Sequence, residues 1–155
     1  MHMSPTATLS PGLALCLTLM RSATTVSRRL DGRLGSWHGV SFADLAILLE
    51  LSRAPGARLR RVDLASQLGL TASAVTRALI PLEKIGLVSR KADPNDARVG
   101  YATITAAGRR VLDEALESAE VMVQEIVRDE GGRLEGCIRL LDGLATGEPS
   151  SPNGA

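Results

Sequence analysis

The sequence predicts a mainly α-helical protein of about six helices with one small β-hairpin. Aromatic residues make up only 2% of the chain, so the core must be aliphatic, which suits packed helices better than a sandwich of strands. Apolar residues recur at helical spacing along most of the chain. The exception is a pair of β-branched segments separated by D-P-N-D at 93–96, which is typical of a hairpin turn.

The 155 residues are enough for one domain, and a hydrophobic content of 45% argues against a disordered chain. We expect the domain to span 10–145, between disordered tails at 1–9 and 146–155. The longest apolar run, 13–20, is far shorter than the ~20 residues of a membrane span, and no Lys or Arg precedes it as in a signal peptide. Two cysteines without a C-x-x-C pattern fit a reducing compartment. We therefore expect a cytoplasmic protein without membrane contact or cofactor.

The first helix is predicted over 10–34. Ser10 followed by Pro11 is typical of a helix start, and the segment 35–39 should break the helix. Its first two turns, LALCLTLM, are apolar nearly all round. A helix buried between two subunits needs such a surface, whereas a monomer does not.

A second, mostly buried helix is predicted to begin at Ser41, which forms a capping box with Asp44, and to end before the loop 53–57. A small helix over 62–68 follows, closed by Gly69.

Thr71 is the expected N-cap of the next helix, which turns apolar residues inward and ends at Gly86; these residues are Val75, Leu79, Leu82 and Ile85. Pro81 should kink or loosen its last two turns, at a cost of roughly 3 kcal/mol unless the surroundings absorb it.

Strands are predicted over 88–91 and 99–105. A long amphipathic helix over 106–128 and a last helix over 132–145 complete the domain, and Cys137 on the apolar face of the last helix is interpreted as a core residue.

Charge is distributed unevenly although the net charge is only +1. Residues 53–110 contain 11 basic and 4 acidic side chains, whereas residues 111–155 contain 3 basic and 10 acidic ones. This pattern is typical of a protein with one surface that faces an anion. The alternative is a chance segregation of solvated helix faces.

Two short helices with a glycine in the turn between them form a helix-turn-helix pattern over residues 62–86. The residues that should point outward near the start of the second helix are Ala72, Ser73, Thr76 and Arg77. Small residues let a helix enter the major groove of DNA, hydroxyls reach phosphates or bases, and Arg can bind guanine through two acceptors. Alternatively, the Ser and Thr only cap the helix.

The hairpin carries the second predicted set of DNA contacts, Arg90, Lys91 and Arg98. A turn needs no Arg to fold, and an Arg beside it can reach into a minor groove. Asp96 cannot favour phosphate and is expected to hold Arg98 or to cap the turn. The alternative is a solvated hairpin with an ion pair.

The run LGLTASAVTRAL, followed by LEKIGLV, DPNDAR and ITAAG, resembles the MarR family of winged helix-turn-helix regulators over residues 10–145. The strongest matches are V-T-R at 75–77, L-E-K-x-G-L-V at 82–88 and D-x-R at 96–98. Ala97 stands where the family commonly has a basic residue, but Arg98, which the family inserts into the minor groove, is kept. Pro81 also departs from the pattern, at the end of the helix rather than on its reading face.

The resemblance implies a homodimer in which each subunit has about six helices and a wing, which is the predicted β-hairpin. The helices at 10–34, 106–128 and 132–145 would form the dimer interface, and residues 41–105 the winged helix-turn-helix. A two-fold dimer would read a pseudo-palindromic operator with half-sites ~34 Å apart.

Two further positions invite a control mechanism. Cys16, in L-C-L-x-L, resembles the hydroperoxide-sensing branch of the family, although the only tyrosine, Tyr101, lies in the wing. The alternative is a buried structural thiol. Trp37 and His38 lie between the first two helices, where the family often binds small aromatic acids. The alternative is a packing Trp with a surface His.

These features predict a DNA-binding transcriptional regulator, a repressor that a small ligand releases. A repressor that senses peroxide through Cys16 is one alternative, and a protein-interaction module that binds no DNA is another. An enzyme is disfavoured, because there are two histidines, one of them His2, and no Gly-rich phosphate loop or G-x-S-x-G motif.

Overall fold

The computed structural model describes residues 9–93, 100–127 and 132–147. In chain order the elements are α1 (Pro11–His38), α2 (Phe42–Arg53), a short 3₁₀ helix η1 (Pro55–Ala57), β1 (Arg58–Arg60), α3 (Arg61–Gln67), α4 (Ala72–Lys84), β2 (Val88–Ala92), β3 (Gly100–Ile104), α5 (Ala106–Ile126) and α6 (Leu134–Thr146). The strands form one antiparallel sheet in the order β1-β3-β2. The predicted class, mainly helical with a small hairpin, is confirmed. Most of both predicted tails, the end of the helix over 106–128, and Asp96 and Arg98 lie outside the described residues.

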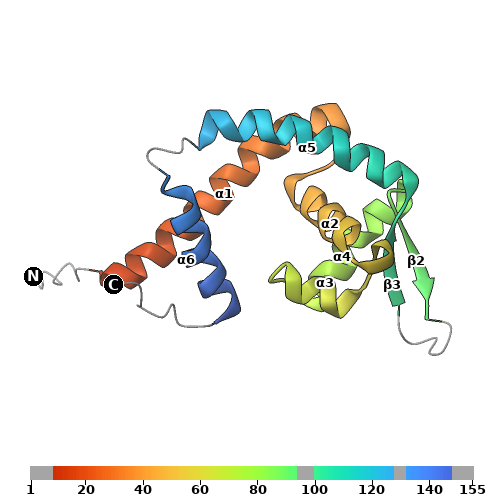
Figure 1. Cartoon of the computed structure of the whole chain (residues 1–155), viewed down its shortest axis with the longest axis horizontal. Coiled ribbons are helices and arrows are strands. Elements are labelled where there is room, and N and C mark those ends of the chain that lie inside the picture. Colours follow the sequence, from red (N-terminus) through yellow and green to blue (C-terminus); the bar gives the residue numbers. More distant parts are fainter. Residues whose placement is uncertain (1–8, 94–99, 128–131, 148–155) are drawn as a thin grey trace, which may run out of the picture.

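The molecule has two parts (Figure 1). One is a lobe made of α2, α3, α4 and the sheet, which we call the reading lobe. The other contains α6 and the N-terminal half of α1, which lie away from this lobe. The C-terminal part of α1 and the long α5 connect the two parts.

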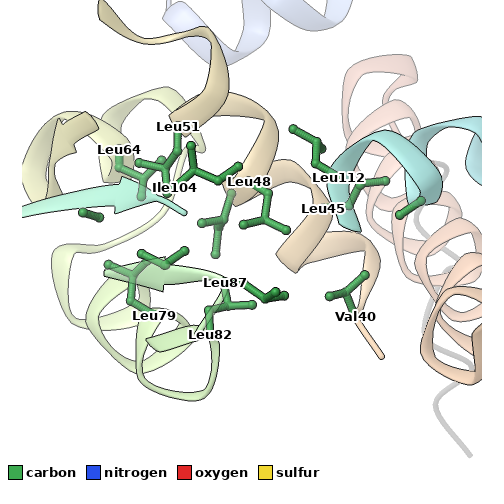
Figure 2. Close-up of a cluster of buried hydrophobic side chains, with 14 of the residues drawn as sticks. Val40, Leu45, Leu48, Leu51, Leu64, Leu79, Leu82, Leu87, Ile104 and Leu112 are labelled. Carbon is green, nitrogen blue, oxygen red and sulfur yellow. The ribbon is translucent and has the colours of Figure 1, made fainter. Parts of the chain in front are cut away.

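One aliphatic core fills the reading lobe and extends under α1 and α5 (Figure 2). Its fully buried residues include Leu48 and Leu51 of α2, Leu64 of α3 and Val75 of α4. Leu30 and Leu34 of α1 and Ala115 of α5 join the same cluster. Burying a side chain of this size stabilises the fold by about 1.5–3 kcal/mol relative to leaving it in water.

The predicted helix starts at Ser10, Ser41 and Thr71 are confirmed, because each hydroxyl accepts a hydrogen bond from a backbone N–H three residues on. Thr105 caps α5 in the same way. At Ser41 the capping box is complete, because the Asp44 carboxylate also accepts from the Ser41 N–H at 2.9 Å. These caps satisfy donors that a helix start leaves unpaired.

The predicted break at 35–39 is wrong, because α1 continues to His38 and ends at Gly39, whose φ of 69° is left-handed. The buried Leu34 anchors this last turn to the core, and the Ser36 hydroxyl donates to the Gly32 carbonyl at 2.8 Å. Packing of this kind outweighs the ~1 kcal/mol that a mid-helix glycine such as Gly35 costs.

Pro81 does not end α4, which runs to Lys84. The Pro81 ring is exposed, the flanking Leu79 and Leu82 are buried, and the Pro81 carbonyl accepts from the Ile85 N–H at 3.1 Å. Tertiary packing therefore absorbs the missing hydrogen bond. Ile85 follows the helix as its C-cap and is 56% exposed, so its predicted inward position is wrong.

Two segments outside the reading lobe, the N-terminal half of α1 and α6, bury little within one chain, and we call them the outer helices. No residue of α6 is buried, and Cys137 is exposed rather than in the core. Cys16 is exposed too, so the alternative of a buried thiol does not hold for a single chain. Leu13, Leu15, Leu17 and Met20 of α1 are between 38% and 61% exposed. Among the described helices, none is long and apolar enough to cross a membrane.

Candidate nucleic-acid interface

The core sets the rotation of α4. Val75, Leu79 and Leu82 are at most 1% exposed, so this side of the helix is fixed against the lobe. Ser73 and Arg77 lie on the opposite side and are exposed, as predicted, and Ala72 is exposed at the first position of the helix. The first turn of α4 therefore presents small, polar and cationic side chains to solvent.

Thr76 is half-buried, and its hydroxyl donates to the Ala72 carbonyl at 2.9 Å. Its proton is thus used within the helix, although its oxygen can still accept a hydrogen bond. The preceding turn passes through Gly69, whose φ of 63° suits glycine, before Thr71 caps α4. The backbone amides at the start of α4 add donors that suit a phosphate.

In the hairpin, Lys91 of β2 is exposed and lies opposite Tyr101 of β3. Arg90 lies opposite Ala102 and forms a salt bridge of 3.5 Å with Glu83 of α4. Arg90 is thus held at the junction of the wing and α4 rather than at the tip of the hairpin.

Sequence reasoning missed the basic strand β1. Arg58 and Arg60 lie opposite Thr103 and Tyr101 of β3, and the Arg58 guanidinium is 4.9 Å from the centroid of the Tyr101 ring. Arg60 Nε donates to the Tyr101 hydroxyl at 3.3 Å, and this hydrogen bond raises the pKa of Arg60. The R-L-R alternation at 58–60 was the available signal, with Leu59 turned toward the core.

The start of α5 is fixed to the end of α4. The Thr105 hydroxyl donates to the Gly86 carbonyl at 2.7 Å, and the Thr105 N–H donates to the Leu87 carbonyl at 3.0 Å. Gly108 is required here, because a Cβ at this position would overlap the Leu87 carbonyl oxygen. These contacts join the start of α5 to the turn that follows α4.

The predicted ligand residues are brought to different surroundings. Trp37 is 63% exposed. The His38 ring is largely buried, with Nε2 at 2.8 Å from the Ser118 hydroxyl and Nδ1 at 4.0 Å from Glu114, both on α5. His38 thus joins α1 to α5, so the alternative of a surface histidine does not hold.

Two hollows lie near this junction. An apolar cavity of about 200 Å³ lies between α2 and α5, lined by Phe42, Leu45, Ala46, Leu49, Leu116, Ala119, Glu120 and Val123. A second hollow of about 230 Å³ lies between α1 and α5, lined by Arg29, Arg33, Met122, Glu125 and Ile126. Neither is lined by Trp37 or His38.

A helix-turn-helix whose second helix presents a polar face, followed by a basic hairpin on the same core, defines a winged helix-turn-helix protein. The model of the MarR family matches residues 40–99, which contain α2 to β2. The chain belongs to the MarR family, a family of transcription regulators and not of enzymes.

Known proteins of this kind resemble the chain along most of its length. Sco3205, a MarR family transcriptional regulator of Streptomyces coelicolor solved in complex with DNA, is 26% identical, with a TM-score of 0.80 over 96% of this chain and 95% of its own. The transcriptional regulator BldR of Sulfolobus solfataricus is 33% identical, with a TM-score of 0.74 over 84% and 94%.

A sequence relative, the uncharacterized HTH-type transcriptional regulator YdgJ of Bacillus subtilis (strain 168), is 30% identical over 89 residues. That match covers 57% of this chain and 53% of YdgJ, so the chain matches about half the length of this relative.

Proposed function

We propose that the protein is a sequence-specific regulator that binds double-stranded DNA. In this proposal α4 enters the major groove with Ala72, Ser73, Thr76 and Arg77, while the wing approaches the adjacent minor groove. The observation that carries it is the exposed, polar first turn of α4 beside a basic hairpin, on a lobe whose other side is closed by core packing. Asp96 and Arg98 keep their predicted roles, outside the described residues.

We propose that the protein acts as a cytoplasmic homodimer. Both outer helices carry exposed apolar side chains, such as Leu17 and Met20 on α1 and Ile138 and Leu144 on α6. Exposed apolar surface of this extent is typical of a subunit interface. A two-fold dimer would place two reading lobes on a pseudo-palindromic operator.

We propose that a small aromatic acid releases the DNA. The apolar cavity between α2 and α5 suits a ring. The separate hollow between α1 and α5 offers Arg29 to a carboxylate, and Arg33 there is paired with Glu125 at 3.2 Å. Trp37 and His38, at the α1–α2 junction, remain candidate reporters and contacts. Because α5 is tied to the end of α4, a ligand that moved α5 would change the spacing of the two reading helices.

The alternative mechanism is oxidation of Cys16, which is exposed in one chain and belongs to the apolar surface of α1. Oxidation to a polar sulfenic acid would disturb a dimer interface at that position. The two mechanisms respond to different chemicals, so they can be separated.

The proposal is tested by selecting bound genomic fragments with the purified protein and measuring affinity as salt rises. A DNA-binding protein should lose affinity steeply through release of counterions. No shift on any duplex at low salt would favour a protein-interaction module instead.

Release of the DNA is then tested with aromatic carboxylates and peroxides on the wild type and on Cys16→Ser. Trp37 is the only tryptophan, so its fluorescence reports on ligand binding. If neither the DNA affinity nor this fluorescence changes with any aromatic carboxylate or peroxide, neither release mechanism operates.

A further inference from the structure

The outer face of the three-stranded sheet carries a compact group of cations. Antiparallel partners point to the same side of a sheet, so Arg60 of β1, Tyr101 of β3 and Lys91 of β2 form one row across it. Arg58 precedes this row by two residues on β1 and shares its face. We call these four residues the outer-face cluster. The buried Ala102, next along β3, points to the opposite side, toward the core.

The cations of this cluster are exposed and are not neutralised by ion pairs. Within 9–93, 100–127 and 132–147, no salt bridge joins Arg58, Arg60 or Lys91 to a carboxylate. Arg90 on the core side of the same hairpin does have such a partner in Glu83. Asp63 and Asp93 also raise the pKa of Arg60 through their charges, but by less than Tyr101 does. The face therefore presents positive charge to solvent.

Tyr101 holds the two arginines in place. The Arg58 and Arg60 guanidinium carbons lie 4.9 and 5.8 Å from the ring centroid, and Arg60 also donates to the Tyr101 hydroxyl. Each guanidinium has five N–H donors, so these contacts leave donors open while restricting the side chains. Restricted arginines with open donors are well suited to phosphate, because less side-chain entropy is lost on binding.

The location of the cluster indicates which phosphates it meets. The sheet lies at the end of the molecule opposite α6 (Figure 1), and two of its strands, β2 and β3, form the hairpin. The Arg61 guanidinium lies against Gly100, where β3 begins, on the side of the sheet opposite the cluster. Arg58 and Arg60 are two residues apart on β1, so their Cα atoms are separated by about 6.8 Å.

We propose that the outer-face cluster binds backbone phosphates of the operator duplex on the side of the wing away from the dimer axis. This inference rests on the proposed DNA-binding function and extends it. The cluster reads no bases and adds affinity only when the duplex continues beyond the half-sites. The flanking DNA must bend toward the sheet, so flexible flanking steps favour binding.

The test compares duplexes of increasing length, each centred on a selected operator fragment. The wild type should bind the longer duplexes about 10-fold to 100-fold more tightly than one trimmed to the half-sites. A triple variant, Arg58→Gln, Arg60→Gln and Lys91→Gln, should lose this gain. The double variant Arg58→Gln and Arg60→Gln, which leaves the predicted half-site contact Lys91 in place, should lose most of the gain and keep its affinity for the trimmed duplex. Each lost phosphate contact should also lower the slope of log affinity against log salt by about 0.9.

A matched control, Arg28→Gln, Arg133→Gln and Arg139→Gln, removes the same charge from exposed positions on α1 and at α6 and should keep the gain. Circular dichroism and the melting temperature check folding, and Tyr101→Phe, which keeps the ring but removes the hydroxyl, should lose only part of the gain.

Two outcomes would overturn the proposal. A triple variant with the wild-type length dependence and salt slope would mean that the face does not contact DNA, as expected of a surface for an acidic protein. A wild type that binds no duplex at all would overturn the proposed function as well, so the two failures can be told apart.

Discussion

Apolar side chains are largely buried in the reading lobe but exposed on the outer helices. In the lobe, Leu48 and Leu64 are fully buried, and side chains cap the starts of α2 and α4. On α6, Ile138 and Leu144 are 55% and 51% exposed. The lobe is thus complete within one chain, whereas α6 and the start of α1 need another surface to cover them. We infer from this difference that the reading lobe, which is packed within one chain, contacts DNA. The exposed surfaces of α6 and the start of α1 pair with a second copy of the chain.

The largest effect is expected from breaking the pairing alone. Leu141→Glu places a charge on the apolar side of α6 and should yield folded monomers, because that helix adds no buried residue to a single chain. Loss of the second lobe should weaken operator binding by on the order of 10²–10⁴-fold. Light scattering and fluorescence anisotropy measure both quantities. Arg139→Gln on the polar side of α6 is the control and should stay dimeric.

A core substitution should act on the lobe itself. Leu48→Ala leaves a cavity and should lower the free energy of unfolding by about 2–5 kcal/mol. Leu144→Ala should instead destabilise the protein by an amount that depends on protein concentration, because its contacts lie between subunits. Thermal unfolding at two concentrations separates the cases. Equal, concentration-independent losses would contradict the division into two regions.

Removing one side chain from the reading face should leave folding and pairing intact. Arg77→Ala should weaken specific binding by about 1–3 kcal/mol and relax the preference at one base pair. Lys84→Ala, which removes an exposed cation at the far end of α4, should change specific binding much less. Equal losses for both variants would mean that α4 contributes only general charge.

The smallest effect concerns a single cap. Ser41→Ala removes the hydroxyl that accepts from the Asp44 N–H and should lower the free energy of unfolding by about 1 kcal/mol. Ser36→Ala, whose hydroxyl bonds within α1, should cost less than about 0.5 kcal/mol. Chemical denaturation measures both, and a larger loss for Ser36→Ala would contradict the importance given to the capping box.

Local chemistry made much of the fold predictable. Hydroxyl caps at Ser41 and Thr71, the inward rows of leucine and the turn at Gly69 are encoded within a few residues of where they act. The same applies to the exposed face of α4, because burial of Val75 and Leu79 leaves only one orientation for Ser73 and Arg77.

The errors occurred where distant contacts decide the structure. Packing of Leu34 against the core keeps α1 helical at Gly35, and buried leucines on both sides of Pro81 keep α4 helical there. The three-residue strand β1 exists because β3 pairs with it, so Arg58 and Arg60 could not be grouped with Tyr101 from spacing alone. The contact of His38 with Ser118, 80 residues away, was equally hidden.

In the proposed complex, two reading lobes joined by the outer helices bind one duplex. Hydroxyl-radical footprinting on a selected operator fragment should show two protected half-sites related by two-fold symmetry, with centres about 10–10.5 base pairs apart or a multiple of this. The protection should be lost with Leu141→Glu. A single asymmetric protected patch that persists in this variant would contradict binding by two paired lobes.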